Sequence, residues 1–373
     1  MMVKGKPISS KNIGNILLIQ LGDIGDVVLS LPAVRALREH FPQSDVIVAV
    51  REKAAELVED CPWTTGVISV EKKERGLIRQ IVYQKDFFLR LRRFQFNLAI
   101  DMRTGSRSAL LALLSGARQR VGFYAGGGEG WRNRVFTHLM LDEGIPGQHM
   151  AEYYSNLLSA CNLKAVHVWP EHRIPCEKQI RAMALLAEQN VLPESPIVAV
   201  QPFSLWGYKE WGVQNFIRLI NRIGLEYDLP IIITGSAGER DKAEDLIRSC
   251  RAVRLYNLAG KTSIGMLAAV LNGCAVFVGG DSAGIHIAAA VGTPTVSIFG
   301  PSSSVAWSPR GERHRVVQKR LHCVPCHQKG CQGSGISRCL EELTVAEVFA
   351  VVKEQIDKVI ASQRNRSARV PSA

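Results

Sequence analysis

The sequence predicts an α/β protein with two domains, each built on a parallel sheet. Short apolar runs that are typical of buried strands alternate with helical segments, as they do in parallel βαβ units. This alternation occurs in both halves of the chain, and in both halves polar residues follow the strands. The length of 373 residues exceeds the usual size of a single core, which favours two domains.

The first half is predicted to begin with a buried strand at 16–19, whose apolar run is too short to span a membrane. A helix at 27–40 follows, kinked or restarted at Pro32. The other elements are expected as strands at 46–50, 67–70 and 98–101, and as helices at 54–59, 76–94, 109–114 and 151–161. The glycine-rich segment 125–130 follows no clear strand and opens no clear helix, so we interpret it as a flexible loop.

A linker at 167–177, which contains Pro170 and Pro175, is expected to precede the second half. The second half should hold a helix at 180–189 and strands at 197–200, 231–235, 275–280 and 295–299. Thr344 and Glu347 form a capping-box pattern, and the apolar spacing after them predicts an amphipathic helix. The predicted divisions are 1–175, 176–343, the helix 344–361 and a disordered tail at 362–373.

The net charge of +12 comes mainly from basic residues in the first half of the chain. A basic face favours a polyanionic partner such as an anionic membrane or a phosphorylated molecule. The sequence has no zinc-finger or RNA-binding pattern, which argues against nucleic acid. It also has no apolar stretch of membrane-spanning length and no signal-peptide core, so we expect a soluble, cytoplasmic protein.

Two Gly-Asp pairs, Gly22-Asp23 and Gly25-Asp26, lie where the first strand gives way to a helix. Open α/β proteins bind ligands at the carboxyl edge of the sheet, so this corner is suited to a catalytic or ligand-binding carboxylate. The residues alone leave open which aspartate has that role. They equally allow Asp26 to be only the N-cap of the helix, because Asp is a preferred cap.

Several positions after the strands of the second half suit a phosphorylated ligand. A helix that starts near Ser282 would offer unpaired N–H groups to a diphosphate. Lys209 can neutralise phosphate as a point charge, and Glu239 suits a ribose hydroxyl. Each has an ordinary alternative: a capped structural helix with His286 packed inside it, a surface lysine, and a charge at a helix start.

Other nucleotide and hydrolase motifs fit less well. No Gly-x-Gly-x-x-Gly follows the first strand, which argues against a dinucleotide oxidoreductase. Gly260-Lys261-Thr262 resembles the end of a P-loop, but Leu255 stands where the earlier glycine is required. Residues 280–284 match the Gly-x-Ser-x-Gly of a nucleophile elbow, yet the acid and histidine that should come later follow no recognisable strand. A serine hydrolase is therefore kept only as an alternative.

Three motifs occur in order: residues 21–32, the segment Lys209-Glu210-Trp211, and residues 280–286 followed by Gly300-Pro301. Together they resemble glycosyltransferase family 9, the lipopolysaccharide heptosyltransferases, over about 16 to 359. The resemblance implies a GT-B fold, in which two Rossmann-like, doubly wound parallel-sheet domains face each other across a cleft. It also implies an N-terminal domain that binds the acceptor and a C-terminal domain that binds ADP-heptose.

By this resemblance Asp26 is the general base, Lys209 binds phosphate, and the nucleotide loop consists of Asp281, Ser282, Ala283 and Gly284, with His286 nearby. Glu239 would contact the ribose. Ser204 would contact phosphate, although residues 201–204 read Gln-Pro-Phe-Ser where better-known members are threonine-rich. The expected acceptor contacts are Asp23, Gly25, Arg103, Arg107 and Arg120, and Arg132 is a further basic candidate.

The chemistry of these residues fits a displacement of the diphosphate, and the resemblance implies that the displacement inverts the anomeric carbon. Asp26 can take the proton of the acceptor hydroxyl, while Lys209 and the helix near Ser282 stabilise the departing ADP. No Asp-x-Asp motif is present, so transfer without a metal ion or other cofactor is expected. One tension stays open: a helix N-terminus stabilises a carboxylate and so works against a base.

The expected acceptor is a phosphorylated, lipid-linked oligosaccharide of the lipopolysaccharide inner core. The basic segment from Arg90 to Arg93 suggests peripheral contact with the cytoplasmic face of the inner membrane. Two alternatives remain within the same fold. One is a transferase that uses another nucleotide sugar or a protein acceptor, and the other is a catalytically inert nucleotide-sugar-binding protein.

Four of the nine cysteines cluster as Cys323-x2-Cys326-x4-Cys331-x7-Cys339. Thiolates are the ligands of structural zinc sites, but the later spacings match no standard zinc finger. The sequence therefore leaves two interpretations open, a structural zinc site and a set of reduced or redox-labile thiols.

Overall fold

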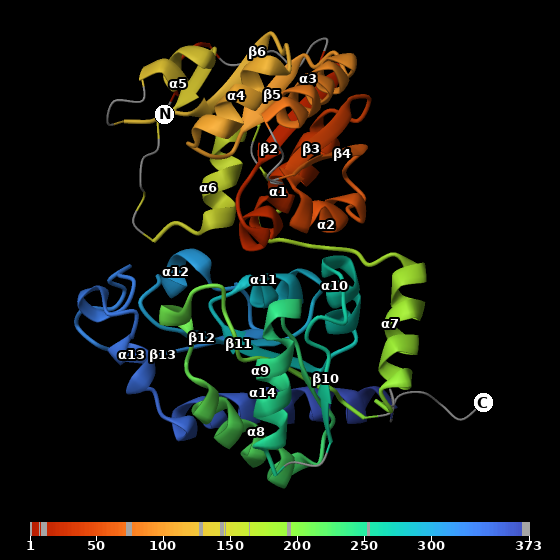
Figure 1. Cartoon of the computed structure of the whole chain (residues 1–373), viewed down its shortest axis with the longest axis vertical. Helices are drawn as coiled ribbons and strands as arrows, with labels where there is room; N and C mark the ends of the chain where they lie inside the picture. Colours follow the sequence, from red (N-terminus) through yellow and green to blue (C-terminus); the bar gives the residue numbers. More distant parts are fainter. Residues whose placement is uncertain are drawn as a thin grey trace. The chain divides into compact units, whose positions relative to one another are not determined.

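The fold was obtained from a computed structural model that describes residues 2–6, 8, 13–71, 77–126, 130–141, 145, 147–163, 165–191, 195–251 and 254–367, without the side chains of 77–83 and 363–367. The chain forms two compact units, Met1–Arg173 and Ile174–Ala373 (Figure 1). The division falls inside the segment 167–177 that the sequence indicates as a linker.

Unit 1 contains a seven-stranded sheet in the order β1-β7-β6-β5-β2-β3-β4. All neighbouring strands are parallel except β1 and β7, which are antiparallel. The strands are β1 (Met2–Lys4), β2 (Asn15–Gln20), β3 (Asp45–Arg51), β4 (Gly66–Val70), β5 (Leu98–Asp101), β6 (Gln119–Phe123) and β7 (His138–Met140). The helices are α1 (Ile24–His40), α2 (Ala55–Glu59), α3 (Leu77–Arg93), α4 (Ser106–Leu114), α5 (Gly130–Val135) and α6 (Met150–Asn156), with short 3-10 turns η1 (Glu52–Ala54) and η2 (Leu157–Cys161).

Both faces of this sheet are covered, because successive side chains of a strand point to opposite faces. Leu17 and Ile19 of β2 pack in a cluster with residues of α3 and α4. Ile16 and Leu18 are also fully buried, and α1 contacts β2 and β3. The central strands β2 and β3 are accordingly near-continuous apolar runs, which is the pattern expected for a parallel sheet covered on both faces.

Two local predictions for this unit were wrong: that the glycine-rich segment follows no strand and opens no helix, and that the first helix restarts at Pro32. The glycine-rich segment lies between β6, which ends at Phe123, and α5, which begins at Gly130, although residues 127–129 are outside the described part. Strand β6 was missed because its first two residues are polar and it is short. Helix α1 starts at Ile24 and continues through Pro32 to His40 without a break.

Unit 2 contains a six-stranded, fully parallel sheet in the order β10-β9-β8-β11-β12-β13. The strands are β8 (Val198–Gln201), β9 (Ile231–Ile233), β10 (Leu255–Asn257), β11 (Val276–Gly280), β12 (Thr295–Phe299) and β13 (His314–Gln318). The helices are α7 (Cys176–Glu188), α8 (Val213–Tyr227), α9 (Arg240–Arg248), α10 (Ile264–Asn272), α11 (Ala283–Ala290), α12 (Ser304–Trp307), α13 (Arg338–Glu341) and α14 (Val345–Ser367), with 3-10 turns η3 (Gly207–Lys209), η4 (Ala237–Glu239) and η5 (Cys331–Gly333).

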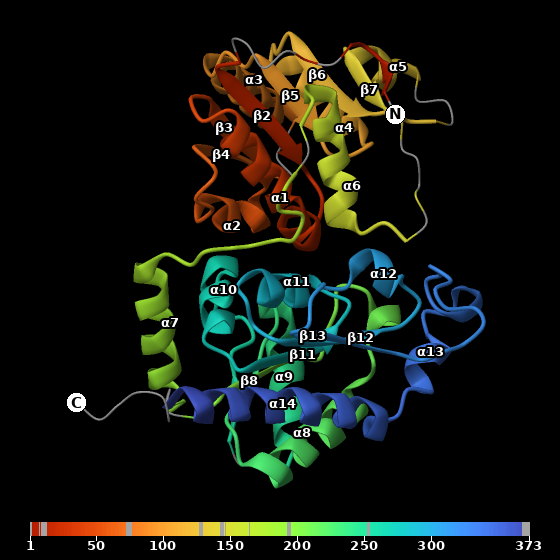
Figure 2. The same cartoon turned by 180° about the vertical axis from the view of Figure 1, so that it is seen from behind.

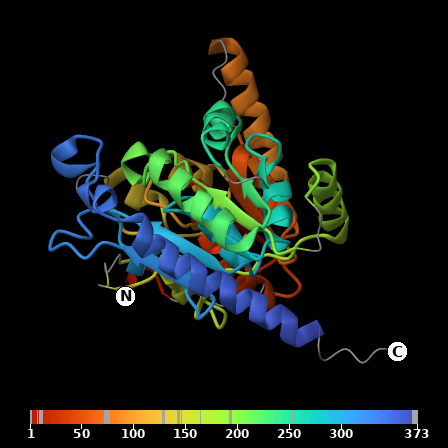
Figure 3. The same ribbon diagram turned by 90° about the horizontal axis from the view of Figure 1, so that it is seen from below.

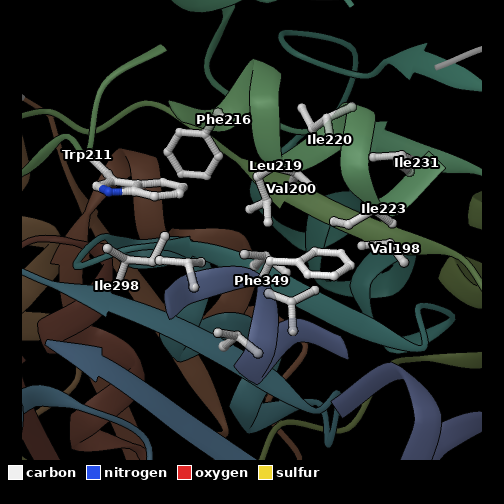
Figure 4. Packing of buried hydrophobic residues seen from close by; sticks show 14 of the residues in the cluster. Val198, Val200, Trp211, Phe216, Leu219, Ile220, Ile223, Ile231, Ile298 and Phe349 are labelled. Carbon is white, nitrogen blue, oxygen red and sulfur yellow. The ribbon is translucent and has the colours of Figure 1, made fainter. Parts of the chain in front are cut away.

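The core of unit 2 lies between the sheet and helices α8 and α14. Alternate residues of the central strands, such as Val198 and Val200, meet Phe216 and Leu219 of α8 and Phe349 of α14 (Figure 4). Helix α14 runs across this face of the sheet beside α8 (Figure 2; blue in Figure 3). Burial of this apolar face accounts for the strong three- and four-residue spacing seen in the sequence.

Helix α14 begins as predicted and ends later than predicted. Thr344 Oγ1 and the Thr344 N–H both donate to Glu347 Oε2, and the Glu347 N–H donates back to Thr344 Oγ1, which confirms the capping box. The expected end at 361 was wrong, because the helix continues to Ser367. The extension reads Ser-Gln-Arg-Asn-Arg-Ser, and its glutamine and two arginines are good helix formers.

The central strands of both units follow the doubly wound order 3-2-1-4-5-6. In unit 1 the order reverses between β2 and β5, and in unit 2 it reverses between β8 and β11. These observations confirm the predicted fold class of two Rossmann-like α/β units. Ligands of such sheets bind outside the carboxyl ends of the strands at the reversal, so the candidate sites lie there. Among the described residues, every helix is too short or too polar to cross a lipid bilayer.

Candidate functional site

The strand–helix corner after β2 is built by a reciprocal cap. Asp23 is the N-cap of α1, and its backbone N–H donates to Asp26 Oδ2 at 2.8 Å. Asp26 therefore occupies the third position of the helix in a capping box, and the alternative that Asp26 is the N-cap was wrong. Gly25 lies between them in the first turn. The cap fixes the Asp26 carboxylate at the sheet edge.

Gly22 lets the Asp26 side chain approach the backbone closely. A Cβ atom added at Gly22 would lie 2.5 Å from Asp26 Oδ2 and 2.6 Å from Asp26 Cβ. Such distances are shorter than van der Waals contact, so a larger residue would displace the carboxylate. Gly22 is thus required, because a side chain at this position would collide with Asp26.

The Asp26 carboxylate is buried and accepts hydrogen bonds from three groups. Besides the Asp23 N–H, Arg103 Nη1 donates to Oδ2 at 3.0 Å and the Tyr154 hydroxyl donates to Oδ1 at 2.5 Å. The Asp26 residue is only 8% exposed. An ionised carboxylate has about four acceptor sites, so these donors leave roughly one site, on Oδ1, for a substrate group.

Arg103 reaches Asp26 from the strand on the other side of the reversal. It follows β5, and its N–H donates to Asp101 Oδ1 at 3.0 Å. Arg132 Nη2 donates both to the Arg103 carbonyl at 2.5 Å and to Asp101 Oδ2 at 3.0 Å. Asp101 and Arg132 are fully buried, so this ion pair holds the Arg103 backbone from inside the unit. Arg132 is therefore not a surface cation, and the interpretation of it as a phosphate contact was wrong.

Burial raises the pKa of Asp101 to about 7, and the Arg103 N–H, Arg132 and the Ser108 hydroxyl each act to lower it. Ser108 Oγ donates to Asp101 Oδ2 at 2.9 Å. All these partners stabilise the ionised form, which a buried carboxylate needs. The network keeps the turn after β5 in one conformation.

Tyr154 is a site residue that the sequence did not indicate. Burial, followed by the charge of Asp26, raises the pKa of Tyr154 well above its ordinary value. The hydroxyl consequently stays protonated and acts as a donor to Asp26. Tyr154 lies in α6, and 128 positions separate it from Asp26 along the chain. No local motif marks such a residue, because only folding brings the two together.

The other predicted acceptor contacts lie in different places. Asp23 Oδ1 accepts from Lys53 Nζ at 2.6 Å and from Arg51 Nη1 at 3.2 Å. Burial acts to raise the pKa of Asp23, but Lys53, Arg51 and Arg103 outweigh it and leave the pKa lowered. Arg107, in the first turn of α4, donates to the Glu71 carbonyl at 2.8 Å.

Arg120 is not part of the Asp26 cluster. It lies near the amino end of β6, and its guanidinium donates to the carbonyls of Val135 and Ala117, both at 2.6 Å. Burial lowers its pKa. The carboxyl end of β6 lies toward the Asp26 edge, so Arg120 is left out of the proposed site.

The reversal point of unit 2 brings together three residues that were predicted to bind the nucleotide-sugar donor. Asp281 and Ser282 follow β11, and Lys209 follows β8 across the reversal. Lys209 Nζ lies 2.5 Å from Asp281 Oδ2, and Asp281 is only 7% exposed. Ser282 is the N-cap of α11, so the N–H groups of Ala283 and Gly284 open the helix beside this ion pair.

Gln201 also lies at this reversal and was not predicted as a site residue. Its Nε2 donates to Ser282 Oγ at 3.3 Å, while its buried Oε1 has no partner among the described residues. A Cβ atom added at Gly284 would lie 2.1 Å from Gln201 Oε1. The glycine therefore makes room for this amide, whose free acceptor is suited to a ligand donor.

Three other residues that were predicted to bind the nucleotide-sugar donor interact with neighbouring protein groups. Glu239 Oε2 accepts from the Ser236 N–H at 2.6 Å and from Ser236 Oγ at 2.8 Å, which caps η4. The Ser204 N–H donates to Glu210 Oε1 at 2.9 Å, and Ser204 Oγ accepts from the Trp206 N–H at 3.3 Å. His286 is buried within α11.

The backbone at Ser282 does not have the geometry of a hydrolase nucleophile. A nucleophile elbow holds its serine on a strained turn. Ser282 instead has φ −145° and ψ 173°, which is relaxed extended backbone, and its Oγ bonds the amide of Gln201. These observations favour a ligand loop over a serine hydrolase.

The four clustered cysteines lie in the segment between β13 and α14 and are free thiols. Burial raises the pKa of Cys339 to about 11, and the neighbouring charges of Cys326, Cys331 and Cys323 add to the rise. The four thiols are therefore close enough in space to influence one another.

The sequence profile of glycosyltransferase family 9 (heptosyltransferase) matches residues 85–336. Lipopolysaccharide heptosyltransferase 3 of Escherichia coli K12 is 25% identical over 290 residues, which cover 76% of this chain and 82% of that protein. The structure of the E. coli ADP-heptose LPS heptosyltransferase II superposes with a TM-score of 0.75 at 19% identity, covering 94% of this chain and 99% of that one. A glycosyl transferase family 9 structure from Veillonella parvula gives a TM-score of 0.77 at 18% identity, with coverages of 94% and 97%.

Proposed function

The chain belongs to glycosyltransferase family 9, and on that basis we propose that it transfers heptose from ADP-heptose to an inner-core acceptor of lipopolysaccharide. The named relatives are glycosyltransferases that act on lipopolysaccharide, and one of the similar structures is described as an ADP-heptose enzyme. The observation that carries the proposal is the pair of reversal-point clusters, a buried carboxylate in unit 1 and a lysine beside a helix N-terminus in unit 2.

In the proposed reaction Asp26 is the general base. The acceptor hydroxyl takes the acceptor site that remains on Asp26 Oδ1 and gives up its proton as it attacks the anomeric carbon of the donor. Arg103 and Tyr154 hold the carboxylate in one orientation through their hydrogen bonds to its two oxygens. Attack from the side opposite to the departing ADP inverts the anomeric carbon.

In the proposed donor site positive charge meets the diphosphate of ADP. Lys209 offsets the negative charge of Asp281 and has further N–H donors for phosphate oxygens. The first N–H groups of α11 point out of the helix and favour an anion. These groups stabilise the charge that develops on the leaving diphosphate, so we expect transfer to proceed without a divalent metal ion at this site.

We propose that the acceptor is a phosphorylated, lipid-linked oligosaccharide. Arg103 uses one of its N–H groups on Asp26 and keeps others for an anionic acceptor group. The exposed Arg90, Arg92 and Arg93 at the end of α3 would contact an anionic membrane surface. Binding to vesicles with anionic lipid, and none to neutral vesicles, is the expected result for this contact.

A donor screen by thermal unfolding tests the proposed substrate class. Ligand that binds the folded state raises the unfolding temperature by mass action. ADP and ADP-heptose should raise it more than UDP, GDP or their sugars at equal concentration. A preference for UDP or GDP would point instead to a family member with another nucleotide sugar. Binding of ADP-heptose without any transfer to heptose-deficient lipopolysaccharide would favour an inert sugar-nucleotide-binding protein.

A further inference from the structure

The segment between β13 and α14 is long, and regular structure in it is confined to the short elements η5 and α13. Its backbone takes left-handed conformations at His327, Gly330, Gln332, Gly333 and Gly335. Loops longer than about 12–15 residues with so little regular structure are uncommon in compact domains and are usually functional. Backbone hydrogen bonds of turns hold part of this segment, such as the one from the Cys331 N–H to the Ile336 carbonyl at 2.7 Å.

Four cysteines of this segment surround one cavity of about 510 Å³. The cavity is lined by Cys323, Cys326, Cys331 and Cys339, together with His322. Cys339 is buried, whereas Cys323 and Cys331 are exposed at its mouth. The Arg338 N–H donates to Cys331 Sγ at 3.4 Å, a backbone contact that would stabilise negative charge on this sulfur. The five other cysteines of the chain line no part of the cavity.

We propose that Cys323, Cys326, Cys331 and Cys339 form a structural site for one thiophilic metal ion of the zinc class. Four cysteine sulfurs satisfy a tetrahedral ion completely and leave no position open for a substrate, as in structural sites. The Cys-x2-Cys pair has the spacing from which one turn of chain supplies two ligands. On binding, each thiol loses its proton to solvent and each sulfur forms a bond to the metal.

The four thiols line the cavity without converging on one point. Among the described residues no three histidine, cysteine or carboxylate side chains converge closely enough to hold a metal ion as they stand. Thiols without a metal repel one another when ionised and gain nothing from converging. Bonds of about 2.3 Å to one ion would draw the sulfurs into the cavity and order the loop around them.

The loop also contacts the segment that carries Lys209. Ser337, which lines the same cavity, donates from Oγ to the Tyr208 carbonyl at 2.6 Å. The His327 N–H donates to the Pro301 carbonyl at 2.9 Å, directly after β12. A metal that orders the loop would therefore stabilise unit 2 beside its reversal point, without taking part in the transfer chemistry.

Metal content of the full chain, purified under reducing conditions without chelator, tests this proposal. We expect about one zinc or iron ion per chain, because a complete four-thiolate site binds such ions tightly. Cys326→Ser should lower the bound metal at least tenfold, since the site then loses a ligand. Cys176→Ser, which changes an exposed cysteine outside the cluster, should leave it unchanged.

A second measurement covers the case in which Cys326→Ser does not fold. Metal-free wild-type protein titrated with Co²⁺ should develop the absorption of tetrahedral cobalt thiolate at one equivalent, and Zn²⁺ should displace it. Absence of bound metal together with no Co²⁺–thiolate absorption would overturn the proposal. A disulfide between any two of the four cysteines in the reduced preparation would overturn it as well. Neither readout depends on transferase activity, so the proposed function can fail while the metal site stands.

Discussion

The Asp26 carboxylate accepts more hydrogen bonds than a general base needs. The Asp23 N–H, Arg103 and Tyr154 all stabilise its ionised form, as does the N-terminus of α1. These groups orient the carboxylate but also oppose its protonation. In the proposed mechanism the bound acceptor excludes water from the Asp26 carboxylate, and this desolvation restores the driving force for proton transfer.

Tyr154→Phe tests whether the hydroxyl positions the base. Loss of a hydrogen bond to a charged group costs roughly 1.5–3 kcal/mol, so kcat should fall about tenfold or more while the Kd for ADP stays unchanged.

Tyr153→Phe is the matched control for this change. Tyr153 is the adjacent residue, and its ring stacks on Phe123 at 4.4 Å. Its variant should keep both kcat and the Kd for ADP. A kcat in Tyr154→Phe equal to that of the wild type would assign Tyr154 to packing alone.

Lys209→Ala should weaken ADP binding by about tenfold or more, since a charged hydrogen bond to phosphate is lost and Asp281 then faces the diphosphate unpaired. Adding Asp281→Asn should recover part of the loss, because the uncompensated charge is removed. Calorimetric titration of ADP measures both effects, with Lys261→Ala as an exposed control in the same unit. An unchanged Kd in Lys209→Ala would exclude this lysine from the donor site.

The sequence indicated the residues that belong to short ordered motifs and missed those that folding supplies. Asp26, Lys209 and Ser282 follow strands, and the structure places each of them at a reversal point. Tyr154 and Gln201 have no local signature. Arg120 and Arg132 were predicted as ligand contacts because of their charge. Charge alone does not show that Arg120 donates to backbone carbonyls or that Arg132 is buried in an ion pair with Asp101.

The same kind of corner occurs in both units: a buried strand, a glycine near its end, an N-cap residue and a helix. In unit 1 the cap is Asp23 before α1, and in unit 2 it is Ser282 before α11. Apolar periodicity predicted the central strands well because they are buried on both faces. It missed edge strands such as β10 and β13, whose residues are mostly half-buried and mixed in polarity.

Strand β13 makes unit 2 sensitive to acid through His314. Burial, then the charges of Arg313 and Arg315, lowers the pKa of His314 to about 4, while Thr295 bonds its Nδ1. A histidine with a lowered folded pKa contributes stability above its unfolded pKa of about 6.5, which is lost as pH falls toward 4. Between pH 7 and pH 5 this linkage should lower the free energy of unfolding by about 1–2 kcal/mol.

His314→Gln removes this linkage, so its free energy of unfolding should fall less over the same pH interval than that of the wild type. Urea unfolding at pH 7, 6 and 5 measures the difference. His167→Gln, at an exposed histidine, should follow the wild-type curve. Parallel curves for His314→Gln and the wild type would show that His314 does not titrate in this window.

In the proposed reaction the two units, which share the same doubly wound order, have different roles. One carries a carboxylate at its reversal point and a set of arginines, and the other carries a cation and a helix N-terminus. The fold class could be predicted because strand and helix patterns repeat along the chain. The polar cluster at each reversal point could be predicted because parallel sheets present their polar turns at one edge. The ion pair Asp101–Arg132 could not be predicted from the sequence, because it depends on contacts across the fold.

Turnover of Asp26→Asn with ADP-heptose and heptose-deficient lipopolysaccharide tests the account most directly. The release of ADP gives kcat, and titration of ADP gives the Kd of the same preparation. Loss of a general base should lower kcat by about 100- to 10 000-fold and change the Kd for ADP by less than about twofold. Turnover close to that of the wild type would contradict the assignment of Asp26 as the base, and no ADP release from the wild type would contradict the proposed reaction.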